Sequence, residues 1–336
     1  MLEDGFPRIR KVGERPGMRW EFPFSNGEVT SVTVAPWTHA MGITAFFNRC
    51  LAVGGSLIVH QRLNAAAFLQ DIEKYGVTFF GGAPSMFINL LSTPGIEKMN
   101  LSSVRAINSG SSPLPMELIA RLSKVFTEAI LVEGYGLTES TMTATTNPTS
   151  RHGLRKIGTV GLPFCDTEIK IVDDEEGNRE LPLGETGEIC IRGPQVMKGY
   201  YNRPEATAEV LRDGWLYTGD IGRVDEDGYL TILDRKKDML IYKGYNVYPR
   251  ELEEILFEHP AVSSCSVIGK RDPAAGEIPK AYVVLAEGRR ASKKDLMDFV
   301  NDRVTPYKKL RELEFVDTLP MSAVGKVLKR VLREKG

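Results

Sequence analysis

Short β-branched or apolar runs alternate with amphipathic segments between residues 29 and 136. The runs at 29–35, 56–60, 77–82, 104–110 and 129–136 predict strands. The segments near 42–51, after Asn64, after Pro84 and from Pro115 predict helices, with Asn64 as an N-cap. Strands and helices that alternate with short links are typical of a parallel sheet with crossover helices.

The pattern changes near residue 158, where short runs separated by turn residues replace this alternation. The runs at 167–173, 187–193 and 228–235 predict a small antiparallel or barrel-like unit. After residue 235, a strand near 239–242, a helix from Pro249, strands near 262–268 and 281–285, and a helix from Ser292 predict a small α+β domain. We therefore expect an α/β protein in four parts: an unassigned segment (1–28), a parallel-sheet β/α subdomain (29–157), a β-barrel-like subdomain (158–234) and a C-terminal α+β domain (235–336).

Composition narrows the class of protein. The 336 residues are 42% hydrophobic and 26% charged with a formal net charge of −1, which excludes a disordered chain, a collagen-like chain and a strongly basic nucleic-acid coat. Cys50, Cys165, Cys190 and Cys265 have neither zinc-site nor disulfide-framework spacing, so we expect a reducing, cytoplasmic environment. The longest uncharged stretches contain turn residues, so no transmembrane segment is expected.

The small net charge conceals an uneven distribution. Residues 1–234 hold 22 basic and 29 acidic residues, and residues 235–336 hold 21 basic and 15 acidic residues, so the two parts carry −7 and +6. A basic small domain beside an acidic large one favours a role for the small domain in handling an anion. Simple drift of surface charge is the alternative explanation.

Two glycine-bearing turns, at 109–114 and 133–140, follow predicted strands. Open parallel sheets bind ligands beyond the carboxyl ends of their strands, so these turns are candidate site segments. The glycines around Tyr135 let the backbone approach a ligand, and the Tyr135 ring suits stacking on a base. Thr138 offers a hydroxyl and an N–H to a phosphate, and Glu139 is a carboxylate suited to Mg²⁺. A glycine-rich turn capped by Thr138 is the simpler alternative.

Three further positions carry polar groups that suit a nucleotide. Asp220, after a Thr-Gly pair, can accept both ribose hydroxyls, although an Asp in a turn more often bonds its own backbone. Arg235 stands where a strand pattern ends, beside a sequence typical of an exposed linker. Lys326 directly follows Gly325 and can neutralise charge on a carboxylate and a phosphate, although most lysines are solvated.

In this order, the segments resemble the adenylate-forming superfamily of acyl-CoA synthetases, peptide-synthetase adenylation domains and firefly-type luciferases. The resemblance runs from about residue 31 to 336 and rests on PWTHAMG (36–42), SGSSPL (109–114), EGYGLTES (133–140), the segment 187–207 and YTGD (217–220). The segment KKDMLIYKGYNVYPRELEE (236–254) looks most like long-chain fatty-acid–CoA ligases.

The resemblance implies a two-step ligase reaction. A carboxylic acid, here a fatty acid, reacts with ATP and Mg²⁺ to give acyl-AMP, and coenzyme A then displaces AMP to give a thioester. The residues that the resemblance assigns to the adenine-binding turn are Gly110, Ser111, Ser112 and Pro113. Those that it assigns to the rest of the nucleotide are Gly134, Tyr135 and Gly136 at the base, Thr138 at the phosphate, Glu139 at Mg²⁺, Asp220 at the ribose and Arg235 at the ribose and phosphate.

The resemblance also implies roles in acyl binding and in the change between steps. It places His39 beside the acyl pocket and makes Lys326 a catalytic residue that bridges the acyl carboxylate and the phosphate. It makes residues 235–336 a lid that turns about Lys237, a hinge closure that withdraws Lys326. The same turn brings Lys243, Gly244 and Tyr245 to the tunnel for the pantetheine of CoA.

One feature departs from the family pattern. Family members carry, ahead of the His39 segment, a Ser/Thr/Gly-rich phosphate loop that ends in Pro-Lys-Gly, and residues 1–35 contain nothing like it. We therefore expect the chain to represent the C-terminal part of such a ligase, or to need a partner chain, and to be weak or inactive in adenylation alone.

Two alternatives to a fatty-acid–CoA ligase stay open. One is another adenylate-forming enzyme that acts on aryl or amino acids, and the other is a non-catalytic nucleotide- or acyl-binding fragment. No nucleic-acid partner is expected, and a homodimer is left open.

Overall fold

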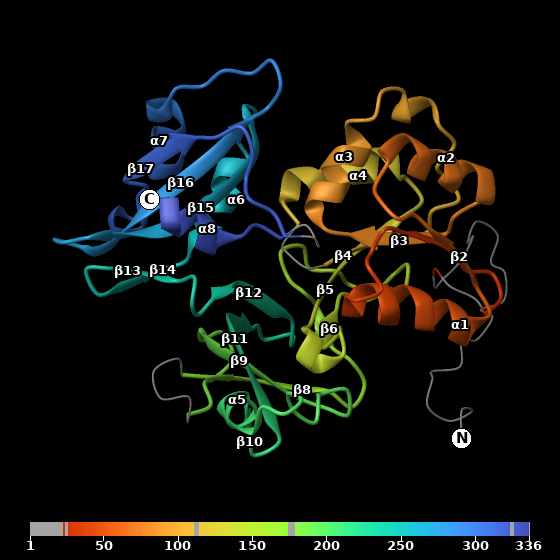
Figure 1. Cartoon of the computed structure of the whole chain (residues 1–336), viewed down its shortest axis with the longest axis horizontal. Coiled ribbons are helices and arrows are strands. Elements are labelled where there is room, and N and C mark those ends of the chain that lie inside the picture. The colour runs from red at the N-terminus through yellow and green to blue at the C-terminus, as the bar shows by residue number, and fades with distance from the viewer. Residues whose placement is uncertain (1–22, 24–25, 111–113, 174–178, 323–325, 336) are drawn as a thin grey trace. The chain divides into compact units, whose positions relative to one another are not determined.

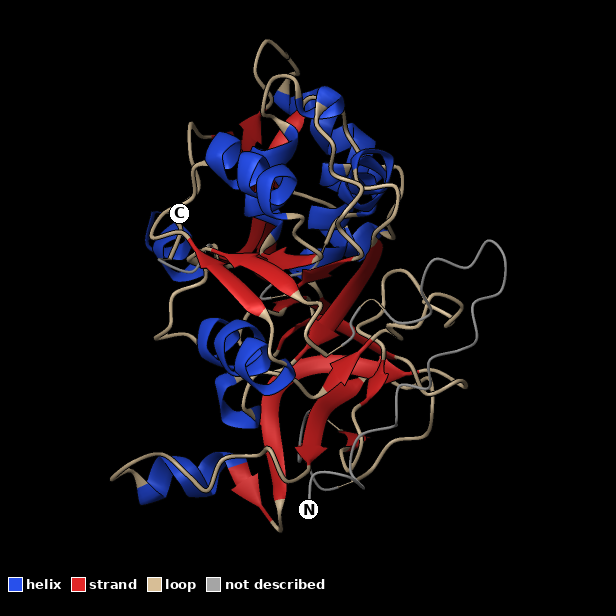
Figure 2. Cartoon of the chain, turned by 90° about the vertical axis from the view of Figure 1, so that its right-hand side faces the viewer, coloured by secondary structure: helices blue, strands red, loops and turns tan. Residues whose placement is uncertain are grey.

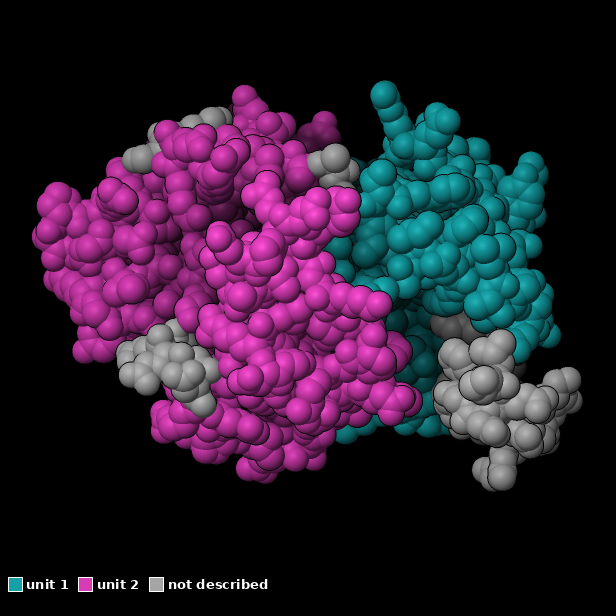
Figure 3. All heavy atoms as spheres, turned by 60° about the horizontal axis from the view of Figure 1, so that its bottom comes forward, with its two compact units in different colours: residues 1–114, 118–157 teal, residues 115–117, 158–336 magenta. Residues whose placement is uncertain are grey.

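The computed structural model describes residue 23 and residues 26–110, 114–173, 179–322 and 326–335 (Figure 1). The chain divides into two compact units, residues 1–114 with 118–157 and residues 115–117 with 158–336 (Figure 3). Each unit has its own sheets and buried apolar clusters, built from the helices and strands in Figure 2. No helix in the described ranges is long and apolar enough to cross a membrane.

The first unit is built on a mostly parallel sheet. Its strands are β1 (Thr30–Thr33), β2 (Ser56–Val59), β3 (Phe79–Gly82), β4 (Ala106–Ser109), β5 (Ile130–Tyr135) and β6 (Thr145–Thr146). They are ordered β2-β1-β3-β4-β5-β6; β1 to β5 are parallel, and β6 is antiparallel to β5. The parallel sheet predicted from the alternating pattern is confirmed.

Helices cover both faces of this sheet. They are the π-helix η1 (Met41–Asn48), which continues into α1 (Arg49–Val53), then α2 (Ala65–Tyr75), α3 (Pro84–Leu91) and α4 (Met116–Val125), with short 3₁₀ turns η2 (Ile96–Lys98) and η3 (Thr138–Ser140). Helices α2, α3 and α4 lie on one face and η1–α1 on the other (Figure 1). As predicted, the Asn64 side chain caps α2 by accepting from the Ala67 N–H at 3.0 Å.

The second unit begins with an antiparallel sheet. The unit's first elements are β7 (Leu162–Pro163), β8 (Glu168–Val172), β9 (Gly187–Arg192), α5 (Pro204–Val210), β10 (Leu211–Arg212), β11 (Trp215–Val224) and β12 (Leu230–Arg235), and β7 is not part of the antiparallel sheet. Four strands are ordered β10-β11-β9-β8, and β12 also pairs with β11. The antiparallel pairing expected here is confirmed.

The rest of the second unit is α+β, as predicted. It contains β13 (Leu240–Tyr242), β14 (Tyr245–Val247), α6 (Pro249–Phe257), β15 (Val262–Asp272), β16 (Gly276–Leu285), α7 (Lys293–Asn301), η4 (Pro306–Lys308), β17 (Glu312–Phe315) and α8 (Lys329–Lys335). The sheet order is β14-β13-β16-β15, with β17 parallel to β16. Helices α6 and α7 pack on one face, and Leu332 of α8 packs with Tyr282 on the other.

Candidate functional site

The loop after β1 holds His39 at the start of η1. The His39 N–H donates to the Pro36 carbonyl at 3.0 Å, and the His39 Nδ1 accepts from the Met41 N–H at 3.2 Å. A Cβ at Gly42 would lie 2.2 Å from the Pro36 carbonyl oxygen, so only glycine lets the helix begin this close to the loop. These contacts fix the half-buried His39 side chain at the helix N-terminus.

Gly110 follows β4 at the carboxyl edge of the same sheet. Its N–H donates to the Gly82 carbonyl at 3.2 Å, and a Cβ there would lie 3.3 Å from the Met41 Cε. The end of β4 and the start of η1 are therefore neighbours at this edge. The other residues predicted for the adenine-binding turn, Ser111, Ser112 and Pro113, lie outside the described residues.

The segment from Gly134 to Gly136 closes the β5–β6 hairpin. Gly134 and Tyr135 pair with Thr146 and Thr145, and the Tyr135 carbonyl accepts from the Ala144 N–H at 2.7 Å. A Cβ at Gly136 would lie 1.9 Å from the Met142 carbonyl oxygen, so this glycine is required by the close approach of two backbones. Tyr135 itself is 8% exposed, so the hairpin holds its ring in a fixed position.

Thr138 and Glu139 lie on η3, directly after this hairpin strand. The Ser140 hydroxyl accepts from the Leu137 N–H at 3.0 Å and so fixes the turn. Thr138 is exposed and Glu139 is half-buried. The next two residues, Thr141 and Met142, have positive φ values of 50° and 90°, a strained conformation for residues other than glycine. The fold thus presents a hydroxyl and a carboxylate together at the carboxyl edge of the sheet.

Glu139 fits a magnesium ion as a single protein ligand. Within the described ranges, no group of three His, Cys, Asp or Glu residues is arranged to hold a metal. Mg²⁺ usually takes one or two carboxylates together with water and substrate phosphates rather than a full protein cage. A half-buried carboxylate next to Thr138 suits that mode of binding.

Asp220 lies in a bulge of β11 rather than in a turn at the end of a strand. Tyr217 pairs with Cys190 of β9 and Ile221 pairs with Glu188, so three residues of β11 face one residue of β9. The Thr218 hydroxyl donates to the Ile189 carbonyl at 2.7 Å and anchors the bulge. A bulge of this kind redirects a side chain out of the ladder.

Asp220 is paired with Arg235. The two residues are opposite each other on β11 and β12, and the Arg235 Nε lies 3.2 Å from the Asp220 Oδ1. Asp220 is 4% exposed. A carboxylate has about four acceptor positions, so this one can hold a guanidinium and ribose hydroxyls together.

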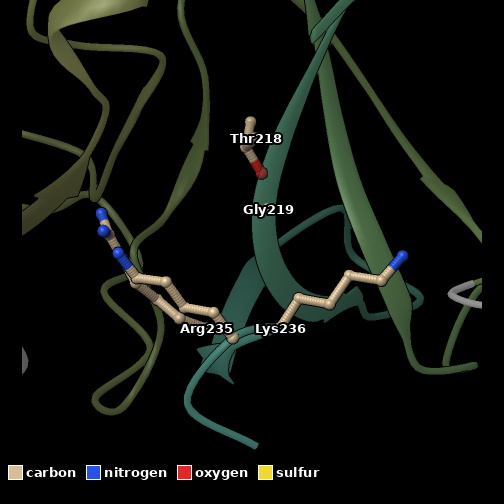
Figure 4. A pocket seen from close by; sticks show the side chains of 5 residues that line it. Thr218, Gly219, Arg235 and Lys236 are labelled. Carbon is tan, nitrogen blue, oxygen red and sulfur yellow. The ribbon is translucent and has the colours of Figure 1, made fainter. Parts of the chain in front are cut away.

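A pocket of about 360 Å³ opens beside this pair. It is lined by Thr218, Gly219, Arg235, Lys236 and Lys237 (Figure 4). The side chains of Arg235, the last residue of β12, and of Lys236 extend in opposite directions. Basic residues therefore surround the pocket, with the Arg235 guanidinium paired with Asp220 and the Lys236 ammonium paired with Glu188. Basic surroundings of this kind favour an anionic ligand.

Lys243 and Gly244 form the tight turn of the β13–β14 hairpin. Both have positive φ, 50° and 85°, which is the requirement of a two-residue type I′ turn. The exposed Tyr245 ring stacks on Tyr307 with centroids 4.9 Å apart. The Lys243 Nζ lies 5.6 Å from the centre of the Tyr242 ring. This hairpin therefore presents aromatic rings and a cation to solvent.

Lys326 is hydrogen-bonded through its backbone to Ser322. The Ser322 N–H donates to the Lys326 carbonyl at 2.8 Å, and the Lys326 N–H donates to the Ser322 hydroxyl at 3.1 Å. Residues 323–325 between them lie outside the described part of the chain. The side chain of Lys326 is half-buried.

The predicted site residues fall into two groups, one in each unit. His39, Gly110, the Gly134–Gly136 hairpin, Thr138 and Glu139 lie in the first unit, at or next to the carboxyl edge of its sheet. The residues in the second unit are Arg235 and Lys237, which line the pocket, Asp220, which pairs with Arg235, and Lys243, Gly244, Tyr245 and Lys326 on the α+β part. The pocket also contains Thr218 and Lys236, which sequence reasoning did not assign to a site. Their adjacency to Asp220 and Arg235 was the available signal.

Comparison with known families accounts for this set of segments. The profile of the AMP-binding enzyme family matches residues 14–201, and that of the AMP-binding enzyme C-terminal domain matches residues 251–326. The chain belongs to the AMP-binding enzyme family. The resemblance to adenylate-forming enzymes is thereby confirmed.

Relatives within this family match almost the whole chain. A long-chain-fatty-acid–CoA ligase of Bacillus subtilis is 42% identical over 316 residues, which cover 94% of this chain and 56% of the relative. A 4-coumarate–CoA ligase-like protein of Oryza sativa is 39% identical, again over 94% of this chain and 56% of the relative. The ATP-bound crystal structure of MatB from Rhodopseudomonas palustris superposes with a TM-score of 0.86 at 33% identity, over 92% of this chain and 60% of that one. The chain thus spans a little over half the length of the AMP-binding enzymes that it matches.

Proposed function

We propose that this AMP-binding protein is an ATP-dependent acid–thiol ligase that joins a fatty acid to coenzyme A through an acyl-adenylate. The supporting observation is the match along 94% of the chain to a protein named long-chain-fatty-acid–CoA ligase, in a chain whose Asp220–Arg235 pair borders a cationic pocket. ATP, Mg²⁺ and CoA are the cofactors of this reaction.

In the first step, a carboxylate oxygen of the acid attacks the α-phosphorus of ATP. The bond from that phosphorus to the bridging oxygen breaks, and pyrophosphate leaves with its electron pair. The Thr138 hydroxyl binds the α-phosphate, and Lys326 bridges the carboxylate and the phosphate. Glu139 would hold Mg²⁺, and the ion would supply neutralisation of the phosphate charge. Catalysis is then a matter of orientation and electrostatic stabilisation.

In the second step, the CoA sulfur attacks the acyl carbon of the adenylate. The carbon–oxygen bond to AMP breaks, AMP leaves, and the thiol proton passes to solvent. The Lys243–Gly244 turn and Tyr245 face the pantetheine in this step, after the segment from residue 235 onward has turned about Lys237. The positive φ values of the turn hold it in one shape, which suits a surface that must be presented as a rigid piece.

The proposed contacts with the nucleotide and the acyl group are made by several segments. Asp220 accepts the ribose hydroxyls and Arg235 binds ribose and phosphate, while Tyr135 stacks on adenine and the turn of Gly110 to Pro113 contacts its edge. His39 borders the acyl group. The firm backbone contacts of His39 and Gly136 support this assignment, because a preorganised site loses less entropy on binding.

An aryl acid is the second candidate for the acyl substrate. Relatives named 4-coumarate–CoA ligase-like 4 from Oryza sativa and feruloyl-CoA synthase from Amycolatopsis are 39% and 38% identical. These identities are close to the 42% of the fatty-acid–CoA ligase.

Thioester formation with a panel of acids tests the proposal and separates the two substrates. The 336-residue chain is incubated with ATP, Mg²⁺, CoA and palmitate, 4-coumarate or phenylalanine, and the acyl-CoA is measured by mass spectrometry. We expect palmitoyl-CoA to form fastest; 4-coumaroyl-CoA as the main product would select the aryl acid. Asp220→Ala is the matched inactive control.

The two half-reactions also distinguish a ligase from a non-catalytic binding protein. Because residues 1–35 contain no Ser/Thr/Gly-rich phosphate loop, we expect the chain to convert supplied palmitoyl-AMP and CoA to palmitoyl-CoA faster than it adenylates palmitate with ATP. AMP binding without either half-reaction would instead favour the non-catalytic alternative.

A further inference from the structure

A buried carboxylate is hydrogen-bonded to the bulge that carries Asp220. Glu188 lies on β9 opposite Ile221 and is 7% exposed. Its Oε1 accepts a hydrogen bond from the Gly219 N–H at 3.0 Å. Gly219 has a φ of 70°, and its N–H lies in the part of β11 that has left the regular ladder with β9. The Glu188 carboxylate therefore binds an amide that the sheet itself does not pair.

The same carboxylate binds the segment that follows β12. The Lys236 Nζ lies 3.2 Å from the Glu188 Oε2, and the Lys236 N–H donates to the Gly219 carbonyl at 2.8 Å. Glu188, Gly219 and Lys236 thus form a closed triangle of hydrogen bonds. Gly219 comes directly before Asp220 in the chain, and Lys236 comes directly after Arg235. The triangle therefore adjoins the ion pair beside the pocket.

Because the Glu188 carboxylate is buried, it needs polar or charged partners at both oxygens. A carboxylate with 7% exposure is strongly destabilised unless charged or polar partners compensate it. Here one oxygen has a backbone amide and the other has an ammonium group. Hydrogen bonds to a charged group are stronger than those between neutral groups, and these two hold the three-residue bulge in one conformation. A Gly219 bulge without this partner would leave a polar amide unpaired.

We infer that Glu188 is a positioning residue for nucleotide binding, which holds the Thr218–Asp220 bulge and the Arg235–Lys236 segment in register. This inference rests on the proposed function, because it assumes that Asp220 binds a ribose. Glu188 acts through Gly219 and Lys236, and the property that it controls is the recognition of the ribose hydroxyls by Asp220.

Discrimination between AMP and 2′-deoxy-AMP measures that property. The affinity of the 336-residue chain for each nucleotide is determined by isothermal titration calorimetry. A lost hydrogen bond to a carboxylate corresponds to roughly tenfold in affinity, so we expect the chain to prefer AMP by about that factor. Glu188→Ala should reduce the preference to about twofold, as Asp220→Asn does.

Two conservative variants make the prediction sharper. Glu188→Gln retains an oxygen that can accept from the Gly219 N–H, so most of the preference for AMP should survive. Glu188→Asp keeps the charge but is one methylene too short to reach both Gly219 and Lys236, so the preference should fall. This second variant also decides the question if Glu188→Ala does not fold.

Glu168→Ala is the matched control, because Glu168 is a carboxylate of the neighbouring strand β8 that pairs with Arg192 and does not line the pocket. It should leave the AMP preference unchanged. A folded Glu188→Ala or Glu188→Asp variant with the full preference would overturn the inference, as would an equal loss in Glu188→Gln and Glu188→Ala. If the unmodified chain does not bind AMP, or Asp220→Asn has no effect, the proposed nucleotide site fails instead.

Discussion

The backbone at Gly136 leaves no room for a side chain. A Cβ there would lie 1.9 Å from the Met142 carbonyl oxygen, whereas at Gly134 it would lie 3.1 Å from the Thr145 carbonyl oxygen. We expect Gly136→Ala to lower the free energy of unfolding by about 2 kcal/mol through overpacking and to weaken AMP binding, because the Tyr135–Thr138 segment must shift. Urea denaturation and calorimetry measure the two effects.

Gly134→Ala is the graded comparison, since its neighbour has to move only by a few tenths of an ångström. It should be the milder of the two variants. Equal stability of the two variants would contradict the close approach of β5 and the Met142 backbone.

The four cysteines should differ in reactivity because only Cys165 is exposed. Burial raises the pKa of Cys190 to about 12 and that of Cys265 well above its ordinary value, so neither forms a reactive thiolate near neutral pH. We expect Ellman's reagent to modify one thiol rapidly at pH 8 and all four in urea. Cys165→Ser should abolish the fast phase; a second fast thiol in the native protein would contradict the burial.

Individual residues were predictable from the sequence where local chemistry decides their role. Asn64 caps α2 as expected, because an N-cap depends only on the next few residues. Glu188 was not singled out, because its role depends on an amide 31 positions away and a lysine 48 positions away. The local signal was that Glu188 is a charged residue between buried residues of strand β9.

Helix α8 is joined to α6 by a buried ion pair. The Lys329 Nζ lies 2.9 Å from the Glu253 Oε1, and both side chains are 17% exposed. Glu253 also accepts from the Val267 N–H of the edge strand β15 at 2.7 Å. Burial disfavours the charged form of Lys329, but the Glu253 and Asp234 carboxylates outweigh it and raise the pKa of the ammonium group.

Lys329→Met should therefore destabilise the second unit strongly. Removal of one partner from a buried pair costs about 3 kcal/mol, since Glu253 and Asp234 are left without their cation. Because the folded-state pKa of Lys329 is raised, its contribution is complete below the ordinary pKa of 10.5 and is lost as the pH rises through the higher folded value. In urea denaturation, the difference from the unmodified chain should be constant from pH 7 to 9 and shrink above pH 10.5.

Lys294→Met is the control, because Lys294 pairs with Asp298 on the exposed face of α7. Its denaturation midpoint should not change. A Lys329→Met variant as stable as this control would show that the α6–α8 pair contributes nothing.

Most strands followed from the local pattern, and two did not. The five parallel strands of the first unit lie within the runs that predicted them, because each run is rich in β-branched or apolar residues and ends at turn signals. Strands β14 and β17 were not predicted, because Asn246 in β14 and Glu312 and Glu314 in β17 interrupt their apolar positions. The bulge in β11 was predicted as a turn, because Thr-Gly-Asp is typical of turns and only pairing with β9 and β12 keeps it within a strand.

At the scale of the whole molecule, the candidate residues are divided between the two units. Thr138 and Glu139 belong to the first unit, and Asp220, Arg235 and Lys326 belong to the second. The order of the motifs along the chain was sufficient to assign the family, but distances between the two groups cannot be read from sequence spacing. The charge division at residue 234 falls within the second unit, so the basic α+β part and the acidic antiparallel sheet are neighbours in one compact body.

This division makes Lys326 the sharpest probe of the two-step reaction. Its proposed role is to neutralise charge as the acyl carboxylate attacks the α-phosphate, and that charge is already dispersed in a finished acyl-adenylate. In a full-length ligase that carries this segment together with the family's phosphate loop, Lys326→Ala should therefore slow pyrophosphate release from ATP and palmitate by about 100-fold, the usual cost of a missing electrostatic contact in a transition state. Conversion of supplied palmitoyl-AMP and CoA should fall by less than about threefold, since the lysine has no bond to stabilise in that step. Lys294→Ala, which removes an exposed lysine from α7, controls for the loss of one positive charge. Equal losses in the two half-reactions would refute the role of Lys326 in adenylation, whereas a selective loss in the first would support it.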